Sequence, residues 1–167
     1  MSLKTSFVAS SLAIAMTLGV GAALTASQSF AYDAASTAVI NVDAEQVILK
    51  GYDVVAYFTA KTATPGDKRF AVKHEGATYY FASAENMQAF KANPGHFAPQ
   101  YGGYCAYGVA IGKKFDVDPT AFKVVNDKLY LNLNPEVFNR WSQDINGNLA
   151  KSEANWPSIR NKAQNDL

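Results

Sequence analysis

A single cysteine, Cys105, is the sequence feature that most limits how this chain can fold. Because no second thiol is available for an internal disulfide, a hydrophobic core has to hold the fold together. The cysteine lies in the segment Tyr-Gly-Gly-Tyr-Cys-Ala-Tyr-Gly at residues 101–108, where three tyrosines and three glycines surround it. Its role is open at this stage: a buried inert residue, a partner in a disulfide between chains, or a reactive thiol.

The first 31 residues have the pattern of a secretory signal peptide. Lys4 gives a positive start, residues 7–24 form an uncharged run, and small residues stand at both key positions of Ser29-Phe30-Ala31. A retained membrane anchor would need about 20 strongly apolar residues, whereas serine, threonine and glycine interrupt this run. We therefore expect cleavage after Ala31, a periplasmic or secreted mature protein, and no stable membrane anchor after cleavage.

Removal of 31 of the 167 residues would leave 136, enough for one domain with a genuine core. Within this part we expect residues 32–46 to form a flexible lead-in and residues 47–165 to form a single domain. The 15 basic and 14 acidic residues nearly cancel, and no basic stripe suggests nucleic acid as a partner. No internal repeat is apparent in the sequence.

Two β-hairpins are predicted. Residues 69–74 and 77–82 are rich in β-forming side chains and are separated by the turn residues Glu75-Gly76. A second pair of short runs, residues 123–125 and 129–131, flanks residues 126–128 in the same way. The two hairpins together predict a small antiparallel sheet.

Helices are predicted after both hairpins. Ser83 is a favourable N-cap for a short helix that ends at Asn93-Pro94-Gly95, and Asn134-Pro135 begins another. A last helix from about Gly147 is expected to break near Trp156-Pro157, because proline cannot donate to the helix ladder. The order of elements predicts an α+β fold, a small antiparallel sheet of hairpins packed with short helices.

Short motifs of several large enzyme classes are absent from the mature region. It holds no dinucleotide-binding or phosphate-binding glycine loop, no HExxH helix and no GxSxG elbow. Asp53, in Gly51-Tyr-Asp, is interpreted as an Asx turn that bonds to its own neighbouring backbone.

Seven segments, in order along the chain, resemble the exported branch of YHS-domain proteins, some of whose members are described as selenoproteins. They are residues 51–58, 77–83, 90–94, 101–106, 118–119, 128–132 and 155–157. The resemblance spans nearly the whole mature chain and implies a YHS-like α+β domain.

One part of the family pattern is missing here. The YHS modules attached to metal-transporting ATPases carry one cysteine after the aromatic strand and another four residues later. The corresponding positions in this chain are Ala82 and Asn86. Because neither side chain is a ligand for a soft ion, this thiolate pair is not inherited.

A metal site could be rebuilt elsewhere, from Cys105 with His74, His96 and Met87. One thiolate, one or two imidazoles and a thioether suit copper, which makes copper the candidate cofactor. The alternatives are that both histidines are ordinary surface residues and that Met87 fills the core.

The loop around Cys105 is the candidate binding site. Its glycines permit a sharp bend that exposes backbone N–H groups, and its tyrosines offer ring surface and hydroxyl groups. The candidate residues are Tyr101, Gly102, Gly103, Tyr104, Cys105 and Tyr107. We expect a binding protein for a metal ion or small ligand more than an enzyme. Thiol redox chemistry at Cys105 and a structural or interaction module are the alternatives.

Overall fold

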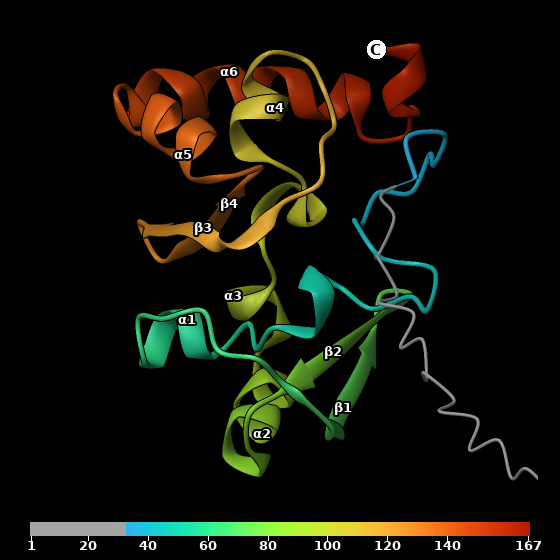
Figure 1. Cartoon of the computed structure of the whole chain (residues 1–167), viewed down its shortest axis with the longest axis vertical. Coiled ribbons are helices and arrows are strands. Elements are labelled where there is room, and N and C mark those ends of the chain that lie inside the picture. The colour runs from blue at the N-terminus through green and yellow to red at the C-terminus, as the bar shows by residue number, and fades with distance from the viewer. Residues whose placement is uncertain (1–32) are drawn as a thin grey trace, which may run out of the picture.

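Two β-hairpins, each followed by helices, make up most of the molecule (Figure 1). The structure is a computed structural model that describes residues 33–167, so the predicted signal peptide lies outside the described residues. Within the described part, no helix is long and apolar enough to cross a membrane.

The first half of the structure begins with the 3-10 helix η1. Its elements are η1 (Leu49–Gly51), α1 (Ala56–Thr59), β1 (Asp67–His74), β2 (Ala77–Phe81), α2 (Ala84–Ala92) and α3 (Pro94–Phe97). The second half consists of η2 (Gln100–Gly103), α4 (Ala106–Ala110), β3 (Asp118–Val125), β4 (Lys128–Asn132), α5 (Pro135–Ser142), α6 (Ile145–Ile159) and η3 (Gln164–Asp166). Figure 1 shows the second half above the first.

The two hairpins have the same register. In each, an outer pair, Asp67 with Phe81 or Asp118 with Asn132, is separated from the rest of the ladder by a β-bulge. Every pair of the second hairpin lies 51 residues after its counterpart in the first. Both two-residue turns, at 75–76 and 126–127, have positive φ at both positions, as type I′ hairpin turns require.

The helix starts follow the same spacing. Ser83 and Asn134 cap α2 and α5, and Asn93 and Asp144 cap α3 and α6. Each of these side chains accepts a hydrogen bond from the N–H three residues later, which satisfies one of the free donors at a helix start. The chain therefore contains a structural repeat.

This repeat corrects the expectation that the chain has none. Between residues 67 and 97, only Asp67, Tyr79 and Glu85 have the same residue 51 positions later. The buried helix residue Phe90 corresponds to Trp141, so even the core side chains differ. The repeat lies in turns, caps and register, which many different side chains satisfy.

The core joins the two halves. One cluster of buried side chains contains Phe81 and Phe90 of the first half together with Leu129 and Leu131 of the second. A second cluster, around Trp141, packs β4 against α4 and α6. Because the first cluster draws on both hairpins while the second cluster lies within the second half, the first half has no core cluster separate from the second half.

The structure confirms the α+β fold class, both hairpins and the caps Ser83 and Asn134. The expected break near Trp156-Pro157 is wrong, because α6 continues to Ile159. Pro157 lies in the last turn of the helix, so it removes a single hydrogen bond, to the carbonyl of the exposed residue Glu153. Trp156 also packs beside the rings of Tyr101 and Tyr104, which favours the helical path.

Candidate functional site

Residues 38–42, which we call the strap, run along the junction between the two halves. The strap is attached to η2, because the Asn41 N–H donates to the Gly102 carbonyl at 2.8 Å. The Asn41 side chain donates to Asp116 Oδ1 at 3.0 Å, and Val42 forms an isolated antiparallel bridge with Ile48. The strap is therefore fixed to both halves.

Lys114 fixes the start of the strap to the end of α6. Its side chain is fully buried, and its Nζ donates to the carbonyls of Ala38, Arg160 and Lys162 at 2.8, 3.2 and 2.9 Å. The ammonium also lies 4.6 Å from the centre of the Tyr104 ring. Burial lowers the pKa of Lys114 from its ordinary value, whereas the three carbonyls favour its charged form.

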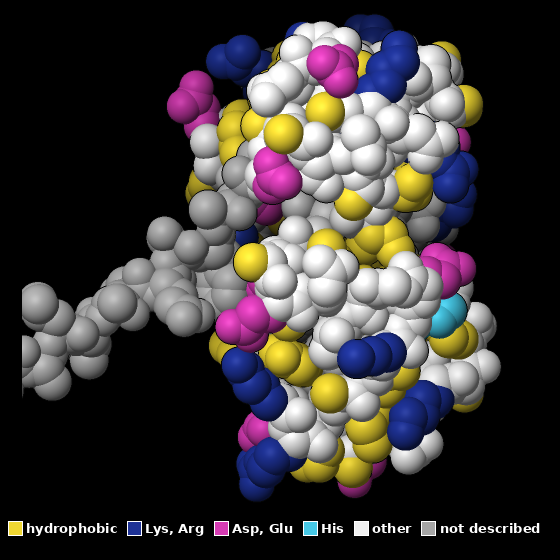
Figure 2. Space-filling view, turned by 90° about the vertical axis from the view of Figure 1, so that its right-hand side faces the viewer, with side chains coloured by type: hydrophobic (Ala, Val, Ile, Leu, Met, Phe, Trp, Pro, Cys, Tyr) yellow, Lys and Arg dark blue, Asp and Glu magenta, His cyan; other side chains and the backbone are white. Residues whose placement is uncertain are grey.

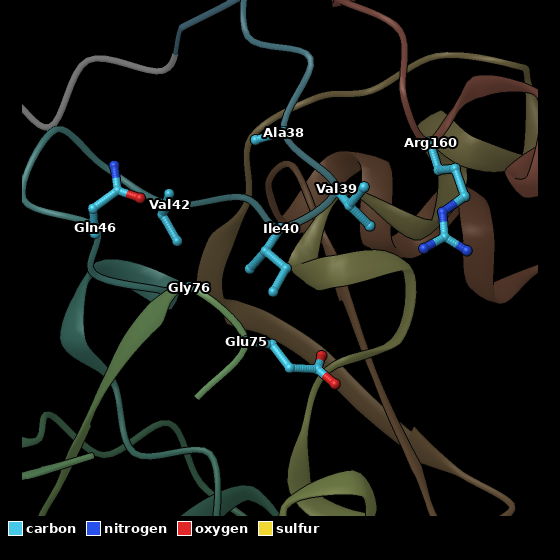
Figure 3. Close-up of a pocket in the computed structure, with 8 residues that line it drawn as sticks. All are labelled: Ala38, Val39, Ile40, Val42, Gln46, Glu75, Gly76 and Arg160. Carbon is cyan, nitrogen blue, oxygen red and sulfur yellow. The ribbon is translucent and has the colours of Figure 1, made fainter. Parts of the chain in front are cut away.

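A groove opens beside the strap (Figure 3). Its larger cavity, about 460 Å³, is lined by Ala38, Val39, Ile40, Val42, Gln46, Glu75, Gly76 and Arg160. A smaller cavity of about 140 Å³ shares Val39, Ile40 and Glu75 with it, and adds Ile48, Tyr79, Ala98, Pro99, Gly102 and Trp156. We call the two together the strap groove. Its walls are mainly apolar.

Two side chains of opposite charge line the strap groove. Figure 3 shows Arg160 and Glu75 on different sides of the cavity, with the side chains of Val39 and Ile40 projecting from the strap between them. Within residues 33–167 the Arg160 guanidinium has no ion pair, and the Glu75 carboxylate has only His74 Nε2, at 3.9 Å. Figure 2 shows Lys and Arg side chains interspersed with Asp and Glu on one face of the molecule.

Cys105 lies in the interior, away from solvent. It is 0% exposed and caps α4, with its Sγ 3.3 Å from the Gly108 N–H and 3.8 Å from Asn132 Oδ1. Burial raises the pKa of the thiol, and backbone N–H groups of Gly108, Leu133 and Tyr107 oppose that rise. The thiol is therefore held in its neutral form more than a free cysteine would be.

Each of the other predicted metal ligands has contacts of its own. His74, at the end of β1, packs against Phe90, whereas His96 in α3 lies 3.2 Å from Asp127 Oδ2. Met87 on α2 packs against the first core cluster. Within residues 33–167, no group of three or more His, Cys, Asp and Glu side chains is arranged to hold a metal ion.

The tyrosine and glycine loop supports the strap. The Tyr104 hydroxyl donates to the Ala38 carbonyl at 2.9 Å, and the Tyr101 hydroxyl donates to Glu153 at 3.1 Å. Gly102 has a φ of 61°, and a Cβ there would lie 2.0 Å from the Val39 carbonyl oxygen, so only glycine fits beneath the strap. Of the six predicted loop residues, Gly102 lines the groove. Tyr101, Gly103, Tyr104 and Cys105 are buried, and Tyr107 is half-buried.

Asp53 does more than the Asx turn expected of it. Its Oδ1 accepts from the Val55 N–H at 2.8 Å and the Ala56 N–H at 3.4 Å, and the residue is 0% exposed. Its Oδ2 accepts from the Ala82 N–H at 2.8 Å and Asn86 Nδ2 at 2.6 Å. The two positions where metal-binding YHS modules carry cysteines thus donate to a buried carboxylate.

Sequence reasoning missed the residues that line the groove. The strap and Arg160 are separated by more than a hundred residues, and an arginine near a helix end gives no local signal of a cavity. The apolar run Val39-Ile40 inside an otherwise polar lead-in was the one available indication that this segment contacts something.

In comparisons with known proteins, one region of the chain matches a known protein family. Residues 55–101 match the YHS domain family, from the residue before α1 into η2. No curated protein and no solved structure matches the chain significantly. The matched residues contain the Ala82 and Asn86 positions and stop before Cys105. The chain therefore contains a YHS domain at residues 55–101.

Proposed function

We propose that this protein is a binding protein that holds a small zwitterionic ligand with an apolar body in the strap groove. The observation that carries the proposal is the cavity of about 460 Å³ with mainly apolar walls and with Arg160 and Glu75 on different sides. Cavities of roughly 300–1,000 Å³ are typical of small-molecule sites.

The chemistry of the groove selects the ligand class. A guanidinium without an ion pair can bind a carboxylate through two parallel hydrogen bonds. The Glu75 carboxylate offers the complementary partner for an ammonium group. Between them, Val39, Ile40 and the adjoining Trp156 provide apolar surface for the body of the ligand. A short apolar peptide with free ends has all three features.

The location we propose, periplasmic or secreted, rests on the pattern of residues 1–31. Cell fractionation with an antibody to the mature chain tests it.

The test uses the dipeptide Leu-Leu as probe and isothermal calorimetry of the protein. We expect Arg160→Gln and Glu75→Gln each to weaken binding about tenfold or more, because each removes a charge-assisted hydrogen bond of roughly 1.5–3 kcal/mol. Lys151→Gln, on the exposed side of α6, is the matched control and should leave the affinity unchanged.

A second probe separates charge recognition from simple apolar binding. N-acetyl-Leu-Leu-amide keeps the apolar body and lacks both charges, so it should bind at least tenfold more weakly than Leu-Leu. Equal affinity for the two probes, or equal affinity of Arg160→Gln and the unchanged protein, contradicts the proposal.

Soft-metal binding at Cys105, with copper first, is a second candidate function. One observation favours it: the Gly108 N–H lies 3.3 Å from the Cys105 sulfur, and such a donor stabilises a thiolate ligand against the effect of burial. Competition of the reduced protein with a Cu(I) chelator tests it. Stoichiometric binding that Cys105→Ser abolishes supports the candidate, and binding unchanged by that substitution contradicts it.

A further inference from the structure

Cys105 occupies, in the second half of the molecule, the position that Asp53 occupies in the first. Three residues of positive φ precede Tyr52-Asp53 and three precede Tyr104-Cys105, and their φ values follow the same order. These values are 49°, 54° and 81° at residues 49–51, and 55°, 61° and 81° at residues 101–103. A short α-helix then follows each of the two residues, α1 after Asp53 and α4 after Cys105.

The same backbone donors surround both side chains. The Asp53 carboxylate accepts from the N–H groups two and three residues later and from the residue that follows β2. The backbone N–H groups near the Cys105 sulfur are those of Tyr107, Gly108 and Leu133. They are likewise two and three residues later and just beyond β4. We call each set of three donors a nest. The first nest holds an anion.

In the second nest a side-chain oxygen, and not the thiol, is the acceptor for one of the three donors. The Tyr107 N–H, whose counterpart donates to the Asp53 carboxylate, donates instead to Asn132 Oδ1 at 3.2 Å. Asn132 is 0% exposed and its carboxamide is aimed at the Cys105 sulfur, 3.8 Å away. Its Nδ2 is buried and has no hydrogen-bond partner within residues 33–167. A buried donor of this kind is costly, and here it borders a site shaped for an anion.

We propose that Cys105 is an oxidation site, at which peroxide converts the thiol to a sulfinate that the second nest holds as the first nest holds Asp53. A sulfinate, like a carboxylate, is a single negative charge shared by two oxygen atoms on one centre. It therefore presents two oxygen acceptors to the three N–H groups, where the thiol presents a single sulfur.

The conversion takes two equivalents of peroxide. In the first step the sulfur of the neutral thiol attacks one peroxide oxygen, the O–O bond breaks, an S–O bond forms, and the thiol proton passes to the leaving hydroxide, giving a sulfenic acid and water. In the second step the sulfenic sulfur attacks another peroxide, giving the sulfinate, a proton and water. Each step oxidises sulfur by two electrons and reduces one peroxide to water.

The sulfinate offers a partner to the buried donor, Asn132 Nδ2, that is unpaired beside the thiol. One sulfinate oxygen accepts from the Tyr107 N–H, as Asp53 Oδ1 accepts from the Val55 N–H. Asn132 is then released from Tyr107, and its Nδ2 can turn to the other oxygen, as Asn86 Nδ2 donates to Asp53 Oδ2. The fourth donor therefore comes from β4 in the second nest and from α2 in the first.

The experiment treats the folded, full chain with hydrogen peroxide and maps its peptides by mass spectrometry. We expect the peptide that contains Cys105 to gain about 32 Da, two oxygen atoms, and to keep them after treatment with a thiol reductant. The melting temperature of the oxidised protein should rise by about 2 °C or more. Oxidation of Cys105 only after the protein unfolds, or a lower melting temperature once it is oxidised, overturns the proposal.

Two variants test the nest without any oxidation chemistry. Cys105→Asp places a carboxylate in the second nest, and Cys105→Asn places a neutral side chain of the same shape there. We expect Cys105→Asp to fold and to melt several degrees above Cys105→Asn. If Cys105→Asp melts at or below the temperature of Cys105→Asn, or fails to fold while Cys105→Asn folds, the second nest does not hold anions and the proposal is wrong.

Discussion

The two halves of this molecule share one backbone plan and differ in what fills its centre. In the first half, the buried Asp53 carboxylate satisfies four donors from three parts of the chain. In the second, the Cys105 thiol fills the equivalent position, and the neighbouring Asn132 Nδ2 is buried without a partner among residues 33–167. The comparison teaches that turns, caps and register specify this backbone plan, whereas the central side chain decides how many of the surrounding hydrogen-bond donors have a partner.

The largest expected effect comes from removing the central side chain of the first half. Asp53→Ala leaves buried N–H groups and Asn86 Nδ2 without their acceptor, so we expect a loss of about 3–5 kcal/mol in the free energy of unfolding. Cys105→Ala removes a small buried side chain with weak hydrogen bonds and should cost about 1–2 kcal/mol. Urea unfolding of both variants measures the difference, and equal losses would show that the two centres are equivalent in energy.

The next effect concerns Lys114, whose fully buried side chain belongs to the second half. Lys114→Met keeps much of the side-chain volume but leaves three carbonyls without this donor, so we expect a loss of about 2–3 kcal/mol. Because the ammonium also holds the start of the strap, limited proteolysis should cut near Ala38 faster in this variant. Lys162→Met, at an exposed position nearby, should change neither quantity.

Alkaline pH should weaken both halves through tyrosines at equivalent positions. Burial raises the pKa of Tyr79 to about 12 and also raises the pKa of Tyr130 from the ordinary value of 10.0. The neutral phenols therefore stabilise the fold fully below pH 10. Above pH 10 the unfolded chain ionises first, so stability falls as pH rises toward 12.

Unfolding in urea at a series of alkaline pH values measures this fall, and Tyr79→Phe should make it less steep. Tyr130→Phe provides the counterpart in the second half. A Tyr79→Phe variant whose stability falls as steeply as that of the unchanged protein would contradict the assignment of the effect to Tyr79.

How much of the fold and of the candidate site could be predicted from the sequence depends on how far apart in the chain the interacting residues lie. The turn at Glu75-Gly76 and the caps Ser83 and Asn134 act within a few residues, and all three were predicted correctly. The strap groove brings residues 38–42 to Arg160, and no local pattern reports that approach.

The site around Cys105 shows the same limit. The cysteine was singled out by its uniqueness, but its burial depends on packing from β4 and α4, which a loop sequence does not contain. Its likeness to Asp53 was equally hidden, because the equivalence lies in backbone angles and N–H positions. A search for repeated turn and cap patterns, in place of repeated residues, is the signal that would have found it.

The smallest expected effect is an exchange between the two hairpin turns, and it tests whether they are equivalent. Glu75 has a φ of 48° and Asn126, at the same position of the second turn, has a φ of 49°. Asparagine tolerates this left-handed conformation better than glutamate, so Glu75→Asn should stabilise the protein and Asn126→Glu should destabilise it, each by about 0.5–1 kcal/mol. The free energies of unfolding in urea should move in opposite directions, and the double exchange should nearly restore the original value. Changes of the same sign would mean that the surroundings of the turns, the strap groove beside Glu75 above all, outweigh the backbone plan that the two halves share.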